Sequence, residues 1–164
     1  MRAPELTVIL SVSAAVNACP TGWTSSPAST SCFLVPPERS TSLFRCLDLC
    51  EEHGGSPACI GSAAENDFVT AKLAAADGLW LGLYQNETGL GPAKGSGHCV
   101  AGDAPSYSNW HEGQPDDYQG YQEGCAWVDP RTGRWRDLAC DGGVRFDPLP
   151  WRLSELSCLC ARGS

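Results

Sequence analysis

Side chains that carry oxygen donors gather in one stretch of the sequence, between residues 109 and 140. The amides and carboxylates of this stretch include Gln114, Asp116, Asp117, Glu123, Asp129 and Asp137. Carboxylate and amide oxygens are the ligands that a hard cation such as calcium prefers. The stretch therefore predicts a calcium site, and the rest of the chain is expected to position it.

Catalytic chemistry is not indicated by the same sequence. The pairs His98-Cys99 and His111-Glu112 are isolated, and neither has a second histidine at a catalytic spacing. No serine nucleophile motif is present. We therefore expect a binding protein and not an enzyme.

Length and charge limit the remaining classes of protein. The chain has 164 residues, which fits one domain with a core of its own. Its formal net charge of -8 argues against nucleic acid, because phosphates attract lysine and arginine. No apolar run has the length of a transmembrane helix.

The N-terminus and the cysteines indicate secretion. Residues 1–18 read as a signal peptide, with Arg2 before a largely apolar run and small residues before a cut after Ala18; a buried N-terminal strand is the alternative. The chain has 10 cysteines, an even number typical of an oxidising compartment. Zinc binding is disfavoured, because no paired Cys-x-x-Cys arrangement occurs. Asn86 begins a glycosylation sequon, so we expect a secreted glycoprotein.

Two helices are predicted in the first half of the chain. Apolar residues recur at helical spacing after the hydroxyl residues 40–42, and Gly54-Gly55 should end that helix. Ser62 and Glu65 form a capping-box pattern before a second helix, which should run to about Ala75 and end at Asp77-Gly78. Residues 125–128 and 134–138 read as two short strands joined by a turn at 130–133.

Several of these motifs together resemble the C-type lectin domain family. The resemblance rests on the helix register, the cysteine frame, the strand Trp80-Leu81-Gly82-Leu83 and the run from Asn109-Trp110 to Gln114-Pro115-Asp116. It covers Cys19 to Cys160, which predicts a C-type lectin-like domain over residues 19–164. The implied fold is α+β and rich in disulfides, with two helices packed on small antiparallel sheets and a long irregular ligand-binding loop region.

The resemblance also implies three disulfides: Cys19–Cys32, Cys50–Cys160 and Cys125–Cys140. Cys46 lies one turn before Cys50, roughly 6 Å away on the same helix face. Cys158 and Cys160 are roughly 6.6 Å apart on one face of the predicted last strand, residues 157–160. A second bridge parallel to Cys50–Cys160 is therefore predicted as Cys46–Cys158, which leaves Cys59–Cys99. Spacing alone does not fix these last two pairs.

In sugar-binding members of the family, one calcium ion also binds two neighbouring sugar hydroxyls. The matching ligand positions here are Gln114, Asp116, Glu123, Arg136 and Asp137. The order Gln-Pro-Asp resembles the galactose-selective subgroup, in which Pro115 would be cis. Tyr118 stands where such proteins stack an aromatic ring on the sugar, although it also fits an ordinary loop aromatic.

Arg136 departs from this pattern, because the family places asparagine there. A guanidinium has donors and no acceptor, so it cannot bind calcium. It either neutralises the neighbouring carboxylates as a built-in cation, or turns into solvent and leaves its coordination position to water.

The sequence thus predicts a secreted, calcium-assisted lectin for galactose-like glycans, with Gln114, Asp116, Tyr118, Glu123 and Asp137 binding the sugar. The alternative is a calcium-independent module of the same fold that binds a protein partner. A purely structural extracellular domain is a third reading, supported only by the disulfides.

Overall fold

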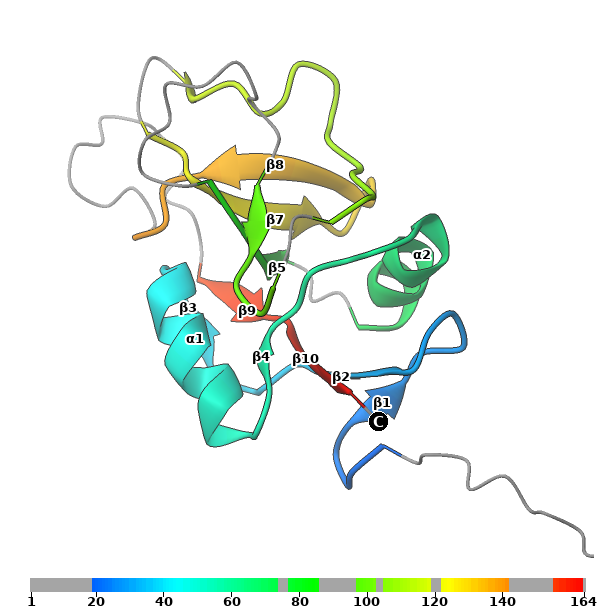
Figure 1. Ribbon diagram of the computed structural model, residues 1–164. Helices are drawn as coiled ribbons and strands as arrows, with labels where there is room; N and C mark the ends of the chain where they lie inside the picture. The colour runs from blue at the N-terminus through cyan, green and yellow to red at the C-terminus, as the bar shows by residue number, and fades with distance from the viewer. Residues whose placement is uncertain are drawn as a thin grey trace, which may run out of the picture.

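The computed structural model describes residues 19–73, 77–85, 97–102, 105–118, 122–141 and 155–163. The predicted signal peptide and the sequon at Asn86 lie outside these residues. Figure 1 shows two helices, α1 (Leu43–Glu52) and α2 (Ala63–Lys72), placed beside short strands.

The strands form two sheets. One has the order β1-β2-β10-β4, from Thr24–Ser25, Ser31–Leu34, Cys160–Gly163 and Ser56–Pro57. The other has the order β3-β9-β5-β7-β8, from Arg39–Ser40, Leu156–Cys158, Leu79–Tyr84, Cys125–Asp129 and Arg134–Leu138, and β6 (His98–Cys99) pairs with β5. The helices and the mainly antiparallel sheets confirm the predicted α+β class.

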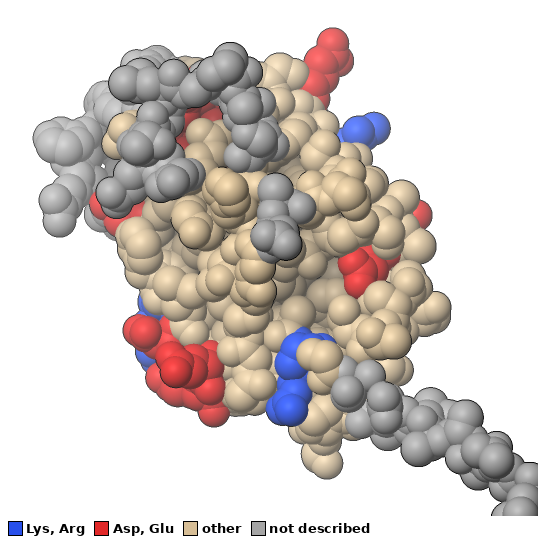
Figure 2. Space-filling view, in the orientation of Figure 1, with Lys and Arg blue, Asp and Glu red and all other residues tan. Residues whose placement is uncertain are grey.

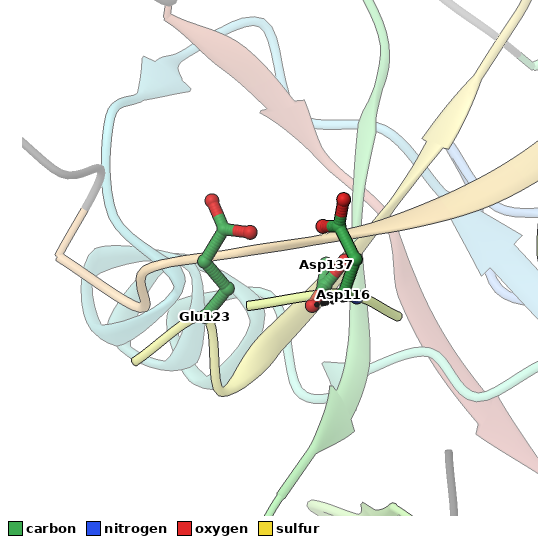
Figure 3. A group of neighbouring side chains, drawn as sticks. All are labelled: Asp116, Glu123 and Asp137. Carbon is green, nitrogen blue, oxygen red and sulfur yellow. Dashed lines mark hydrogen bonds between the residues drawn. The ribbon is translucent and has the colours of Figure 1, made fainter. Parts of the chain in front are cut away.

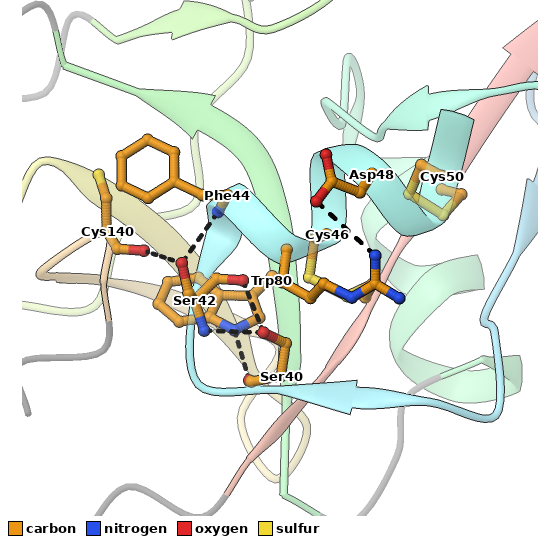
Figure 4. The surroundings of a disulfide bond; sticks show 11 residues. Ser40, Ser42, Phe44, Cys46, Asp48, Cys50, Trp80 and Cys140 are labelled. Atoms are coloured by element: carbon orange, nitrogen blue, oxygen red, sulfur yellow. Dashed lines mark hydrogen bonds and ion pairs between the residues drawn. A yellow bond between two sulfur atoms is a disulfide. The ribbon is translucent and has the colours of Figure 1, made fainter. Parts of the chain in front are cut away.

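Serine caps begin both helices, as predicted. The Ser42 hydroxyl accepts from Phe44 N and donates to the Cys140 carbonyl, which ties the start of α1 to the end of the site region (Figure 4). Ser62 accepts from Glu65 N, and Glu65 accepts in return from Gly61 N. α2 ends at Lys72, with Leu73 as its C-cap packed against the core, and the predicted end at about Ala75 lies outside the described residues.

Strand β5 lies at the centre of the larger sheet and is almost wholly buried. Trp80 is 1% exposed, and its Nε1 donates to the Ser40 carbonyl (Figure 4). At Gly82 a Cβ atom would lie 2.1 Å from the Pro57 carbonyl oxygen, so only glycine allows β4 and β5 to approach this closely. Because β5 also pairs with β7, it fixes the hairpin that carries part of the candidate site.

The predicted last strand is divided, which is a correction. β9 pairs with β3 and β5, whereas β10 pairs with β2 and β4 in the other sheet. Leu159 lies at the crossing, fully buried between the two sheets. The physical reason lies in the bonds of Leu159, whose N donates to the Trp80 carbonyl on β5 and whose carbonyl accepts from Ala58 N just after β4, so the chain changes partner there.

Five disulfides hold this arrangement: Cys19–Cys32, Cys46–Cys158, Cys50–Cys160, Cys59–Cys99 and Cys125–Cys140. They are the same pairs that the sequence predicts. Although Cys158 and Cys160 belong to different strands, both reach the buried face of α1. One helix is therefore bonded to both sheets.

Figure 2 shows acidic side chains gathered over α1, whose exposed residues include Asp48, Glu51 and Glu52. This agrees with the acidic composition of the chain. Among the described residues, no helix is long and apolar enough to cross a membrane.

Candidate functional site

The segment from Asn109 to Asp116 lies along strand β8. Trp135 N donates to the Asn109 carbonyl, and His111 N donates to the Trp135 carbonyl, which forms a parallel bridge between Trp110 and Trp135. The following Gln114–Pro115 peptide bond is cis. The segment therefore delivers Gln114 and Asp116 to the part of β8 that carries Asp137.

Three carboxylates meet there. One oxygen each from Asp116, Glu123 and Asp137 lies within 4.8 Å of the others. Figure 3 shows the Glu123 and Asp137 carboxylates pointing in the same direction, with Asp116 next to Asp137. Asp116 is exposed, Glu123 is half-buried and Asp137 is 5% exposed, so the group runs from the surface into the protein.

Backbone hydrogen bonds hold these acids in place. Asp137 Oδ2 accepts from the amides of Asp116 and Asp117, each at 2.9 Å. Gln114 Oε1 accepts from Asp137 N at 3.3 Å, and Glu123 Oε2 accepts from Tyr118 N at 2.9 Å. The loop and β8 are thus bonded to each other through the candidate ligands themselves.

Asp117 belongs to this network, although the sequence predicts no role for it beyond that of an oxygen donor. Its Oδ1 accepts from Glu123 N at 3.3 Å. Its φ of 45° is a left-handed conformation that aspartate tolerates better than most residues. Asp117 therefore shapes the turn that brings Glu123 to the other two acids.

The clustered charges repel one another. Burial raises the pKa of Glu123 to about 7; the Tyr118 amide opposes this rise, and the charges of Asp137, Asp116 and Asp117 add to it. Burial also raises the pKa of Asp137, against the amides that bond to it, with Asp116 adding to the rise. Without a cation, the site therefore favours protonation.

The donor set fits calcium. None of Asp116, Glu123 and Asp137 forms an ion pair with a basic side chain of the described residues. Three uncompensated carboxylates and the Gln114 amide oxygen are ligands of the kind that a hard cation takes.

Arg136 does not act as a built-in cation in this arrangement. It lies on β8 next to Asp137, but it forms no ion pair with Asp116, Glu123 or Asp137 in the part of the chain that the structure describes. Its positive charge instead lowers the pKa of Asp129, where burial acts in the opposite sense and the hydrogen bonds of Arg131 do most of the lowering. The position that the sequence assigns to a fifth ligand therefore supplies none.

Tyr118 is 42% exposed and follows the acidic loop directly. Its backbone is bonded to Glu123, so its ring lies close to the carboxylate group in the chain and open to solvent. This placement is compatible with a ring that stacks on a ligand.

A sequence profile of the lectin C-type domain matches residues 39–146. The chain therefore belongs to the C-type lectin domain family, whose members and fold are generally not enzymatic. The family predicted from the sequence is confirmed at this level, and the Gln-Pro-Asp subgroup stays a prediction.

Individual relatives agree with this assignment. C-type lectin domain family 4 member G of Homo sapiens is 33% identical over 123 residues, which is 75% of this chain and 39% of that protein. The chain thus spans well under half of that relative. An alpha-N-acetylgalactosamine-specific lectin of Patiria pectinifera is 30% identical over 109 residues, covering 62% of this chain and 61% of that one.

A solved structure of a C-type carbohydrate-recognition domain has a similar fold. The cow C-type carbohydrate-recognition domain of CD23, solved in the presence of GlcNAc2Man3 oligosaccharide, superposes with a TM-score of 0.70 at 27% identity. The superposition covers 90% of this chain and 98% of that domain.

Proposed function

We propose that this domain binds galactose-like sugars through a calcium ion held by Gln114, Asp116, Glu123 and Asp137. The observation that carries the proposal is the group of three carboxylate oxygens within 4.8 Å, uncompensated by any basic side chain of the described residues. When bound, calcium would offer coordination positions to sugar hydroxyls.

The chain's own residues would do the rest of the recognition. Gln114 presents an amide and Asp116 a carboxylate, so a hydroxyl pair meets one neutral group and one acceptor-only group. The exposed ring of Tyr118, two residues after Asp116 in the chain, is suited to the apolar face of a sugar. The Patiria pectinifera relative, named for alpha-N-acetylgalactosamine, supports a galactose-like class of ligand.

The direct test is isothermal titration calorimetry of the domain with calcium, followed by galactose and mannose. We expect calcium to bind and galactose to bind only in its presence, with mannose weaker. Sugar binding that persists in chelator, or a preference for mannose, would contradict the proposal.

The second candidate function is a calcium-independent interaction module that binds a protein partner. Arg136 favours it, because this residue removes one of the ligand positions that the family uses. Secretion remains a proposal of ours on either reading, supported by the five disulfides.

Two substitutions of Arg136 separate these functions. Arg136→Asn should raise calcium affinity by about tenfold, because it adds one neutral oxygen ligand. Arg136→Ala should leave the affinity nearly unchanged, since the guanidinium makes no ion pair with the three carboxylates. Calcium binding that appears only in the alanine variant would instead show that Arg136 occupies the site as a cation.

A further inference from the structure

Two buried side-chain polar atoms of the described residues lack a hydrogen-bond partner. They are Trp110 Nε1 and Asp137 Oδ1. The other two tryptophans buried in the sheets satisfy theirs, since Trp80 Nε1 donates to the Ser40 carbonyl and Trp135 Nε1 to Asn66 Oδ1. Leaving such a group unpaired costs roughly 1–3 kcal/mol, so the exceptions need a physical reason.

Both residues line the same small cavity, which has a volume of about 10 Å³. Leu83, Ala126 and Glu123 also line it. A cavity needs roughly 10–15 Å³ of this kind to hold one water molecule. Its size thus matches a single water and excludes a larger ligand.

The two unpartnered atoms are chemically complementary. The indole N–H is a donor only, and the Asp137 carboxylate is an acceptor when ionised. A cation between them would satisfy the acid but face the positive end of the indole N–H. A water molecule can accept from one and donate to the other at the same time.

Trp110 also borders a wider hollow of about 450 Å³, with His111, Glu112, Thr132 and Arg134. Its Nε1 atom is buried, however, so the open hollow does not supply the partner. The small cavity is the place where this N–H can be satisfied.

Trp110 is rigidly held in this position. Its backbone neighbours bond to Trp135, and its ring meets the Trp135 ring edge-on, with centroids 5.8 Å apart. Trp135 is two residues before Asp137 on β8. A donor fixed in this way can orient a carboxylate that it does not touch.

We infer that the cavity holds one ordered water molecule, which accepts from Trp110 Nε1 and donates to Asp137 Oδ1, and that Trp110 is thereby a positioning residue for the site. The water fixes one oxygen of Asp137, while the amides of Asp116 and Asp117 fix the other. Trp110 thus governs how the buried acid faces the loop.

The test begins with the metal-free wild-type domain. An NMR spectrum that detects transfer between water and indole protons should show a cross-peak from a long-lived water to Trp110 Nε1–H. Absence of that cross-peak would overturn the inference. This measurement needs no variant and does not depend on calcium.

The positioning role is tested by Trp110→Phe, which keeps an aromatic ring and removes the donor. We expect the amide signals of Asp116 and Asp117 to shift and exchange faster, and calcium affinity to fall about tenfold, as for other groups that orient a metal ligand. Unchanged amide signals would refute the role.

Tyr107→Phe is the matched control, because Tyr107 also meets Trp135 edge-on, at 5.7 Å, but does not line the cavity. It should leave amide signals and affinity unchanged. The positioning role rests on the proposed function only for the calcium readout. If the wild type bound no calcium, the proposed function would fail, while the water and amide signals would still decide the role of Trp110.

Discussion

Glu123→Gln should weaken calcium binding at least about tenfold and, at the same time, stabilise the metal-free domain. The affinity falls because a neutral amide replaces one of three anionic ligands. The metal-free domain gains stability, because burial and the neighbouring aspartates disfavour the ionised form of Glu123, whose pKa is raised to about 7. The glutamine oxygen can still accept from Tyr118 N.

The expected gain at pH 8 is about 1 kcal/mol after a discount for solvent screening at a half-buried position, or about 3 °C in melting temperature. Calorimetric titration and thermal unfolding in chelator measure the two effects. Glu112→Gln is the control, since Glu112 is exposed in the same loop and lies outside the carboxylate group. A Glu123→Gln variant with full calcium affinity would place the metal elsewhere.

Acid should abolish the difference in melting temperature between the calcium-loaded and the metal-free domain. A carboxyl with a raised folded-state pKa destabilises the fold when ionised, and this penalty is relieved as pH falls from about 7 toward the ordinary value of 4.5. The metal-free domain should therefore gain stability from Glu123 over that range. Asp137, whose pKa is also raised, acts in the same sense.

Calcium reverses the direction in which stability changes with pH, because it binds the ionised acids and lowers their pKa values. The stability that it adds is present at neutral pH and is lost as protons compete in acid. Scanning calorimetry with calcium and with chelator, at pH 7.5 and pH 5, would follow both curves. Identical curves at pH 7.5 would remove calcium from the function and favour the protein-binding alternative.

Several features of the fold can be predicted from short stretches of the sequence. The capping serines 42 and 62 need only neighbouring amides, so their roles follow from the sequence around them. The meeting of Asp116, Glu123 and Asp137 was predicted only through the family resemblance, since these residues lie in separate segments. Long-range pairing of this kind has no local pattern.

Other features depend on contacts that the sequence does not display. The division of the last strand at Leu159 depends on hydrogen bonds to Trp80 and Ala58, which are distant in the sequence, so the residues around Leu159 do not reveal it. The sequence places Trp110 in a family motif, but nothing in its neighbours reveals an unsatisfied N–H. Among the described residues Arg136 forms no ion pair with the three acids, and this depends on the folded arrangement, which the identity of the residue alone does not give.

The pairing of β2 with β10 sets Ser31 opposite Gly163, and Cys19 is bonded to Cys32 on the same strand β2. Figure 1 places these segments at the opposite end of the molecule from β7 and β8. Anything joined before residue 19 or after residue 163 would therefore tether the domain by one pole and leave the carboxylate loop presented outward. Several copies on one support would all offer that loop to the same opposing surface, with a spacing set by the tether and not by the domain.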